Sequence, residues 1–79
     1  MLPTCYPLAM ITENDKKLGR RIQNLRKKAV LKQEELAEMV RFTTKYIQFI
    51  ETAHRIPSLK ALYRIAHALN VSVSELFSF

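Results

Sequence analysis

The side chains best suited to bind a ligand lie on a short segment that runs from residue 43 to residue 51. Ile47 and Ile50 stand three residues apart and predict the buried side of a helix. At about 100° per residue, the outward side and its flank carry Thr44, Lys45, Gln48 and Phe49. A lysine can donate to guanine, a glutamine can pair with an adenine edge, and a phenyl ring can contact the methyl group of thymine. The segment therefore has the chemistry to bind base edges in the major groove of double-stranded DNA.

The charge of the chain also favours an anionic partner. Thirteen lysines and arginines against seven acids give a net charge of +6. Eight bases occur without an intervening acid: Lys16, Lys17, Arg20, Arg21, Arg26, Lys27, Lys28 and Lys32. This run predicts nucleic acid as the first partner and a membrane surface as the second. The alternative is a solvated helix face.

The sequence lacks the sets of residues that catalysis or metal binding would need. His54 and His67 are not spaced four residues apart, and the glutamates within residues 34–38 have no nucleophile, glycine-rich phosphate loop or histidine beside them. Cys5 is the single cysteine, so it can form neither an intramolecular disulfide nor a cysteine zinc site, and a reducing cytoplasmic setting is expected. We therefore expect no enzyme activity, no cofactor and no metal.

Apolar residues at helical spacing predict an all-α domain of five short helices over residues 13–79, since no stretch alternates as a strand would. The first helix has Thr12 or Asn14 as its N-cap and buries a stripe of Leu18, Ile22, Leu25 and Ala29. The second follows Lys32, which is a poor cap. Only residues 41–42 separate it from the third helix, so these two helices must cross steeply and the third faces outward.

The last third of the chain carries clear helix boundaries. Pro57 ends the preceding segment, and Ser58 caps a fourth helix, which runs to about Asn70. Residues 72–75 are a capping box that opens a short fifth helix, under which Leu76 and Phe77 should pack.

Residues 1–12 precede this domain and are expected to form a flexible or extended arm. Their longest apolar run, residues 5–11, is far shorter than the roughly 20 residues that cross a bilayer, so no membrane span is expected. The arm is the one segment free to bind a protein partner such as a toxin.

An ordered series of short motifs runs from Leu18 to Phe77: Leu25-Arg26, Gln33-Glu34-Glu35-Leu36-Ala37, Ile47 with Ile50-Glu51, Pro57-Ser58-Leu59, Leu62, the segment 66–72, and Leu76. At these spacings the chain resembles the helix-turn-helix domains of the lambda repressor and Cro family, the XRE type. The resemblance covers about three quarters of the chain. It implies a five-helix lambda-repressor-like fold and binding to double-stranded DNA.

The resemblance also implies roles for particular residues. Base contacts fall to Thr44, Lys45 and Phe49, with Gln48 close by. Phosphate contacts fall to Gln33, Thr43, His54 and Arg55. Arg26 and Glu51 match a buried ion pair that ties the first helix to the third, and loss of one partner should cost about 3–5 kcal/mol.

Two features depart from the family pattern. Arg41 and Ala53 stand where the family usually has glycine, and each costs on the order of 1–2 kcal/mol if its backbone is left-handed. Phe42, Tyr46 and Phe49 form an aromatic stripe at i, i+4 and i+7. Core packing is favoured for the first two. For Phe49, core packing and an outward contact in the DNA groove are about equally favoured, and contact with a protein is a further alternative.

These observations favour a sequence-specific transcriptional regulator, a repressor in the first instance, that binds two half-sites about one helical turn apart as a homodimer. Leu76, Phe77 and Phe79 are the expected dimer interface, with frayed ends as the alternative. Phage repressors, restriction-modification controllers and antitoxins share this size. The alternative function is a protein-interaction module, an antirepressor or antitoxin-like partner binder, that uses the aromatic stripe. A peripheral membrane helix is disfavoured because the first helix needs its apolar stripe for the core.

Overall fold

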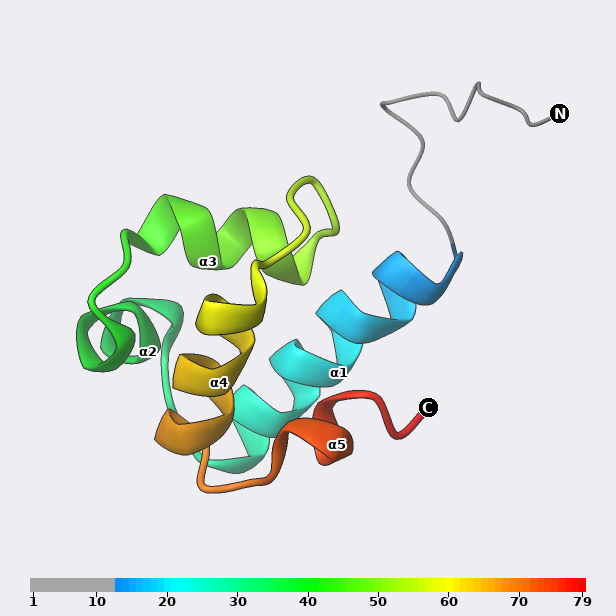
Figure 1. Cartoon of the computed structure of the whole chain (residues 1–79). Coiled ribbons are helices and arrows are strands. Elements are labelled where there is room, and N and C mark those ends of the chain that lie inside the picture. The colour runs from blue at the N-terminus through cyan, green and yellow to red at the C-terminus, as the bar shows by residue number, and fades with distance from the viewer. Residues whose placement is uncertain (1–12) are drawn as a thin grey trace, which may run out of the picture.

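The computed structural model describes residues 13–79, which form five helices and, within this range, no strand (Figure 1). The helices are α1 (Glu13–Lys28), α2 (Gln33–Val40), α3 (Thr44–Glu51), α4 (Leu59–Ala68) and α5 (Val73–Leu76). The all-α, five-helix prediction is confirmed. The predicted arm, like Thr12, lies outside the described residues.

A single core lies between the helices and receives side chains from all five. Its fully buried members are Ile22, Leu36, Ile47, Ile50, Ile65 and Leu76. α3 packs against both α2 and α1, while α4 packs against α2 and α5. Figure 1 shows α2 and α3 running in clearly different directions, as their short connection requires. The core therefore holds α3 by one side only.

Most helix starts have the caps that the sequence predicts. The side chains of Thr43 and Ser58 each accept a backbone N–H from the first turn, at 3.1 Å. The backbone N–H of Ser72 donates to the Glu75 carboxylate at 3.2 Å. α2 begins without a side-chain cap from Lys32, but the Lys32 backbone N–H donates to Glu35 at 2.8 Å. A carboxylate in the first turn thus replaces part of the missing cap.

Three local predictions are wrong. Asn14 lies inside α1 rather than capping it, because the helix already includes Glu13. Ala29 is exposed, since α1 ends at Lys28 and the chain turns away before the stripe is completed. Phe77 is 47% exposed and does not pack beneath α5.

The turns around α3 keep a left-handed backbone without glycine. Arg41, the C-cap of α2, has φ 62°, and Ala53, just after α3, has φ 64°. The Arg41 backbone N–H donates to the carbonyl oxygens of Ala37 and Glu38 in α2. The family geometry is therefore retained, and each residue bears the strain that a Cβ brings to this region.

Candidate DNA-binding surface

The outward side of α3 is polar and open to solvent at its centre. Lys45 and Gln48 are exposed, whereas Thr44 and Phe49 are half-buried. On the opposite side, Ile47 and Ile50 are each only 1% exposed. The structure thus brings the four predicted base-contacting side chains onto one helix whose apolar side is fixed in the core.

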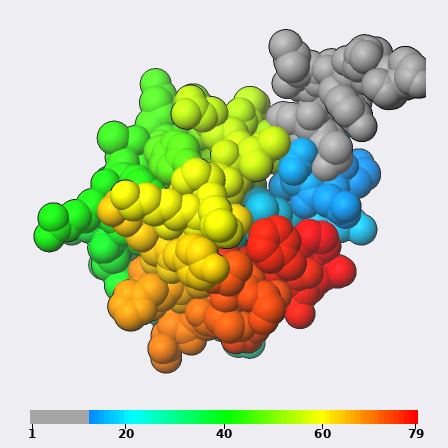
Figure 2. All heavy atoms as spheres, viewed as in Figure 1, coloured from blue at the N-terminus to red at the C-terminus, as the bar shows by residue number. Residues whose placement is uncertain are grey.

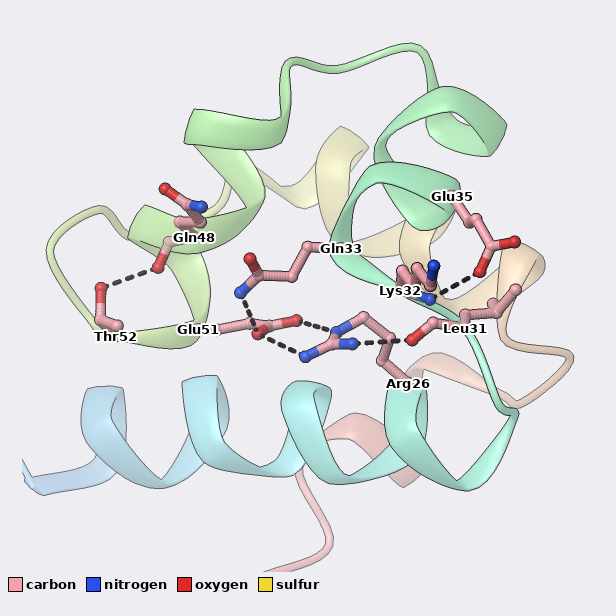
Figure 3. A network of polar contacts seen from close by, with 8 residues as sticks. All are labelled: Arg26, Leu31, Lys32, Gln33, Glu35, Gln48, Glu51 and Thr52. Atoms are coloured by element: carbon pink, nitrogen blue, oxygen red, sulfur yellow. Dashed lines mark hydrogen bonds and ion pairs between the residues drawn. The ribbon is translucent and has the colours of Figure 1, made fainter.

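A buried polar network fixes the end of α3 to α1 and α2 (Figure 3). Nε of Arg26 lies 2.6 Å from Oε2 of Glu51, and Nη2 of Arg26 donates to Oε1 at 3.2 Å. Arg26 also donates to the backbone oxygen of Leu31 at 2.7 Å, so the guanidinium is held on two sides. The Glu51 side chain has no solvent exposure. A bidentate pair in such a site has fixed geometry, which transmits the position of α1 to α3.

The same network reaches the predicted phosphate-contacting residue Gln33. Its Nε2 donates to Oε1 of Glu51 at 2.9 Å, and its side chain lies at the N-terminus of α2. An amide nitrogen carries two hydrogens, so one remains for a ligand. The start of a helix also attracts anions through its free backbone N–H groups. Sequence reasoning missed this contact, because neither residue type nor spacing indicated that Gln33 reaches Glu51, 18 positions away.

An apolar groove with a cationic rim runs beside α3. It has a volume of about 610 Å³ and is lined by Arg41, Phe42, Thr43, Lys45, Tyr46, Phe49 and Arg55. The Phe42 and Tyr46 rings meet edge to face with centroids 5.0 Å apart, and both pack against the core. Arg64 lies over Phe42 at 5.5 Å and Arg55 lies over Tyr46 at 5.7 Å. This wall of aromatic rings under guanidinium groups favours an anionic ligand with apolar parts.

The loop after α3 presents two predicted phosphate contacts. His54 and Arg55 are both exposed, and their backbone N–H groups donate to the oxygen of Phe49 at 2.8 and 3.1 Å. The His54 ring lies 6.0 Å from the Phe49 ring. The loop therefore continues the cationic rim past the end of α3.

Not every base in the α1 run is free to bind a ligand. Arg26 is buried in its ion pair, and Nε of half-buried Arg21 donates to the backbone oxygen of Glu75 at 2.9 Å. The other six members of the run are exposed: Lys16, Lys17, Arg20, Lys27, Lys28 and Lys32. The resemblance had already set Arg26 apart from this run, but nothing in the sequence distinguished Arg21 from the exposed bases.

The predicted dimer residues fall into two groups. Leu76 is 0% exposed and belongs to the core, so it cannot contact a partner, and that assignment is wrong. Phe77 and Phe79 are 47% and 52% exposed, with ring centroids 6.4 Å apart. Figure 2 shows that the C-terminal residues form part of the surface beside α1 and α4.

Two features are absent from the described part of the chain. Residues 13–79 contain no cluster of three or more histidines, cysteines or acids that could hold a metal ion. Within the same range, no helix is long and apolar enough to span a bilayer.

Two helices at a steep angle, the second with its polar side outward, define a helix-turn-helix protein. The helix-turn-helix model of the HTH_3 family matches residues 22–76, and the chain therefore belongs to this family of DNA-binding transcriptional regulators. It is 39% identical over 59 residues to an uncharacterized HTH-type transcriptional regulator of Archaeoglobus fulgidus, a match that covers 75% of this chain and 83% of the relative.

Two solved structures are similar over most of the chain. The restriction-modification controller protein C.AhdI from Aeromonas hydrophila has a TM-score of 0.81 and 32% identity, with 84% of this chain and 100% of that chain covered. SinR, the master regulator for biofilm formation, was solved in complex with DNA. It has a TM-score of 0.73 and 32% identity, with 77% of this chain and 98% of that chain covered.

Proposed function

We propose that this protein is a sequence-specific transcriptional regulator that inserts α3 into the major groove of double-stranded DNA. The observation that carries the proposal is the exposed centre of α3, Lys45 and Gln48, within a cationic rim that includes Arg41 and Arg55. The structure of SinR in complex with DNA supports this choice of ligand.

The contacts follow from the chemistry of each side chain. Lys45 and Gln48 are proposed to bind base edges, with Thr44 and Phe49 beside them. Phosphates are proposed to lie against Gln33 and Thr43 on one side of α3 and against His54 and Arg55 on the other. Phosphate contacts fix the register, whereas base contacts select the sequence.

We further propose that the protein acts as a homodimer through Phe77 and Phe79. A single α3 makes few base contacts, and linking two copies raises the effective concentration of the second at its half-site. A dimer on a promoter would block it, so repression is the expected outcome. Phe79→Ala should lower DNA affinity at low protein concentration and shift sedimentation toward the monomer.

The central experiment selects bound sequences from a random DNA pool. A palindrome with half-sites about one helical turn apart is expected. On the selected DNA, Lys45→Ala should cost about 1–3 kcal/mol and relax preference at one position, whereas Arg55→Ala should weaken all sequences equally and reduce the salt dependence. Uniform weakening by both variants would refute the assignment of α3 to base recognition.

A second function is favoured by one observation, the aromatic wall of the groove. Phe42, Tyr46 and Phe49 could receive an apolar peptide, as in an antirepressor or antitoxin that binds a protein. DNA affinity should fall steeply with added salt, whereas such a contact should not. A flat salt profile on every DNA tested would favour the protein partner.

A further inference from the structure

The loop after α3 holds a histidine in one defined tautomer. Oγ1 of Thr52 lies 2.7 Å from the backbone oxygen of Gln48, as Figure 3 shows, and 2.8 Å from Nδ1 of His54. A backbone carbonyl has no hydrogen to donate, so the single hydroxyl proton of Thr52 points at Gln48. The hydroxyl oxygen then accepts from Nδ1–H of His54. In the neutral ring, Nε2 is left as a bare acceptor.

The position of the ring is fixed as well as its tautomer. Its ring centroid lies 6.0 Å from that of the Phe49 ring, with the two planes tilted by 46°, and the His54 backbone N–H donates to the Phe49 oxygen at 2.8 Å. His54 nevertheless stays exposed. The imidazole is therefore held at the end of α3, with Nε2 free to meet a ligand.

The charged groups around this loop are mostly cations, although Asp15 of α1 also lines a pocket beside Arg55 and Ile56. Thr52 lines a shallow crevice together with Lys16 and Arg20 of α1 and with Glu51, whose carboxylate is bound to Arg26. Arg55 follows directly in the loop and lies over the Tyr46 ring. These cations attract a phosphate to the loop.

A phosphate that arrives at His54 meets one of two surfaces. The neutral ring presents the lone pair of Nε2, which repels the phosphate oxygen. The protonated ring presents an N–H donor and a positive charge, which form a charge-assisted hydrogen bond. Histidine is the side chain whose charge ordinarily changes between pH 5 and pH 8.

We propose that His54 binds a DNA phosphate only as the imidazolium, and that Thr52 is the positioning residue that imposes this requirement. The inference rests on the proposed function. A neutral ring does not make this contact, so the affinity for DNA rises as the pH falls. Thr52 acts through the tautomer and not through its own contact with DNA.

The test compares the salt dependence of DNA binding at pH 5.5 and pH 7.5. Each phosphate contact contributes about 0.9 to the slope of the logarithm of affinity against the logarithm of salt concentration. The wild-type slope should be steeper by about 0.9 per protomer at pH 5.5, with affinity rising at most about tenfold per pH unit for each proton taken up. His54→Gln should give equal slopes. His67→Gln changes the other histidine, exposed on α4, and should behave as the wild type.

Thr52→Val tests the positioning role, because valine keeps the branched shape and lacks the hydroxyl. The neutral ring of His54 can then carry its proton on Nε2 and donate to a phosphate at pH 7.5. DNA affinity at this pH should rise about three- to tenfold above wild type, with a weaker pH dependence. In the free protein, the ¹⁵N shifts of neutral His54 should show the proton on Nδ1 in wild type and on Nε2 in Thr52→Val.

The outcomes separate this inference from the proposed function. Equal wild-type slopes at the two pH values, or a neutral ring protonated on Nε2 in the wild type, would overturn the inference and leave DNA binding in place. A DNA affinity that does not depend on salt concentration at either pH would overturn the proposed function and this inference with it.

Discussion

Replacement of Gly19 on α1, even by alanine, is predicted to destabilise the protein. A Cβ at this position would lie 2.5 Å from the backbone oxygen of Ile50 and 2.8 Å from that of Glu51. Carbon and oxygen atoms in contact stay about 3.3 Å apart or more, so α1 would have to move from α3 by about 0.8 Å. Both oxygens belong to the backbone and cannot rotate away. Gly19→Ala must therefore displace a helix.

Two effects of opposite sign determine how much Gly19→Ala changes the free energy of unfolding. Alanine in a helix interior is favoured over glycine by about 0.5–1 kcal/mol. Overpacking a tight interface costs about 1–3 kcal/mol, and the shift also pulls on the buried pair of Arg26 and Glu51. We expect a net loss of about 1–2 kcal/mol in the free energy of unfolding. In a domain of this size, that loss lowers the melting temperature by about 5–15 °C.

Urea and thermal unfolding, followed by circular dichroism, measure the change. Asn24→Ala is the matched control, because Asn24 is exposed on the same helix and alanine has the higher helix propensity. This variant should be at least as stable as the wild type. A Gly19→Ala protein as stable as the control would show that α1 and α3 are not in close contact here and that α1 does not hold α3 rigidly.

Further predictions concern the buried ion pair, two residues with a left-handed backbone and the cap of α3. Arg26→Met should lower the free energy of unfolding by about 3–5 kcal/mol, because it leaves Glu51 buried and unpaired; urea unfolding should show the loss largely restored when Glu51→Leu is added. Val30→Gly should stabilise the protein by about 1 kcal/mol, since a β-branched residue is strained at φ 60°. Asn70→Gly, also at φ 60°, should be nearly neutral because asparagine tolerates this region. The melting temperature should therefore rise in Val30→Gly and stay close to that of the wild type in Asn70→Gly. Thr43→Ala removes the cap of α3 and should cost about 1 kcal/mol by the same assay, and no loss would contradict the capping role.

Helix boundaries could be predicted from the sequence where they depend on neighbouring residues. Thr43 and Ser58 bond to backbone groups three positions away, and the capping box at residues 72–75 is equally local. Such contacts lie within one turn, so residue type and spacing determine them. The periodicity of Ile47 and Ile50 likewise identified the buried side of α3, because a short helix has only one side to bury.

The errors arise where the outcome depends on packing between distant segments. Ala29 continues the stripe of α1 in spacing, yet the helix ends one residue earlier, and spacing alone does not mark that end. Leu76 is the last residue of the four-residue α5 and Phe77 is its C-cap, and only the packing decides that the first is buried and the second exposed. Nothing in the sequence indicated the close contact of Gly19 with α3, since the backbone that Gly19 faces lies more than 30 positions along the chain.

The support of α3 explains how stability and DNA recognition can be separate in so small a domain. An isolated helix of eight residues is unstable in water, so α3 depends on its contacts. Ile47 and Ile50 supply those contacts on the core side, and Glu51 fixes the last turn. Lys45 and Gln48 contribute little to this support because they are exposed. Substitutions at these two positions should therefore change the DNA sequence that is bound without unfolding the domain.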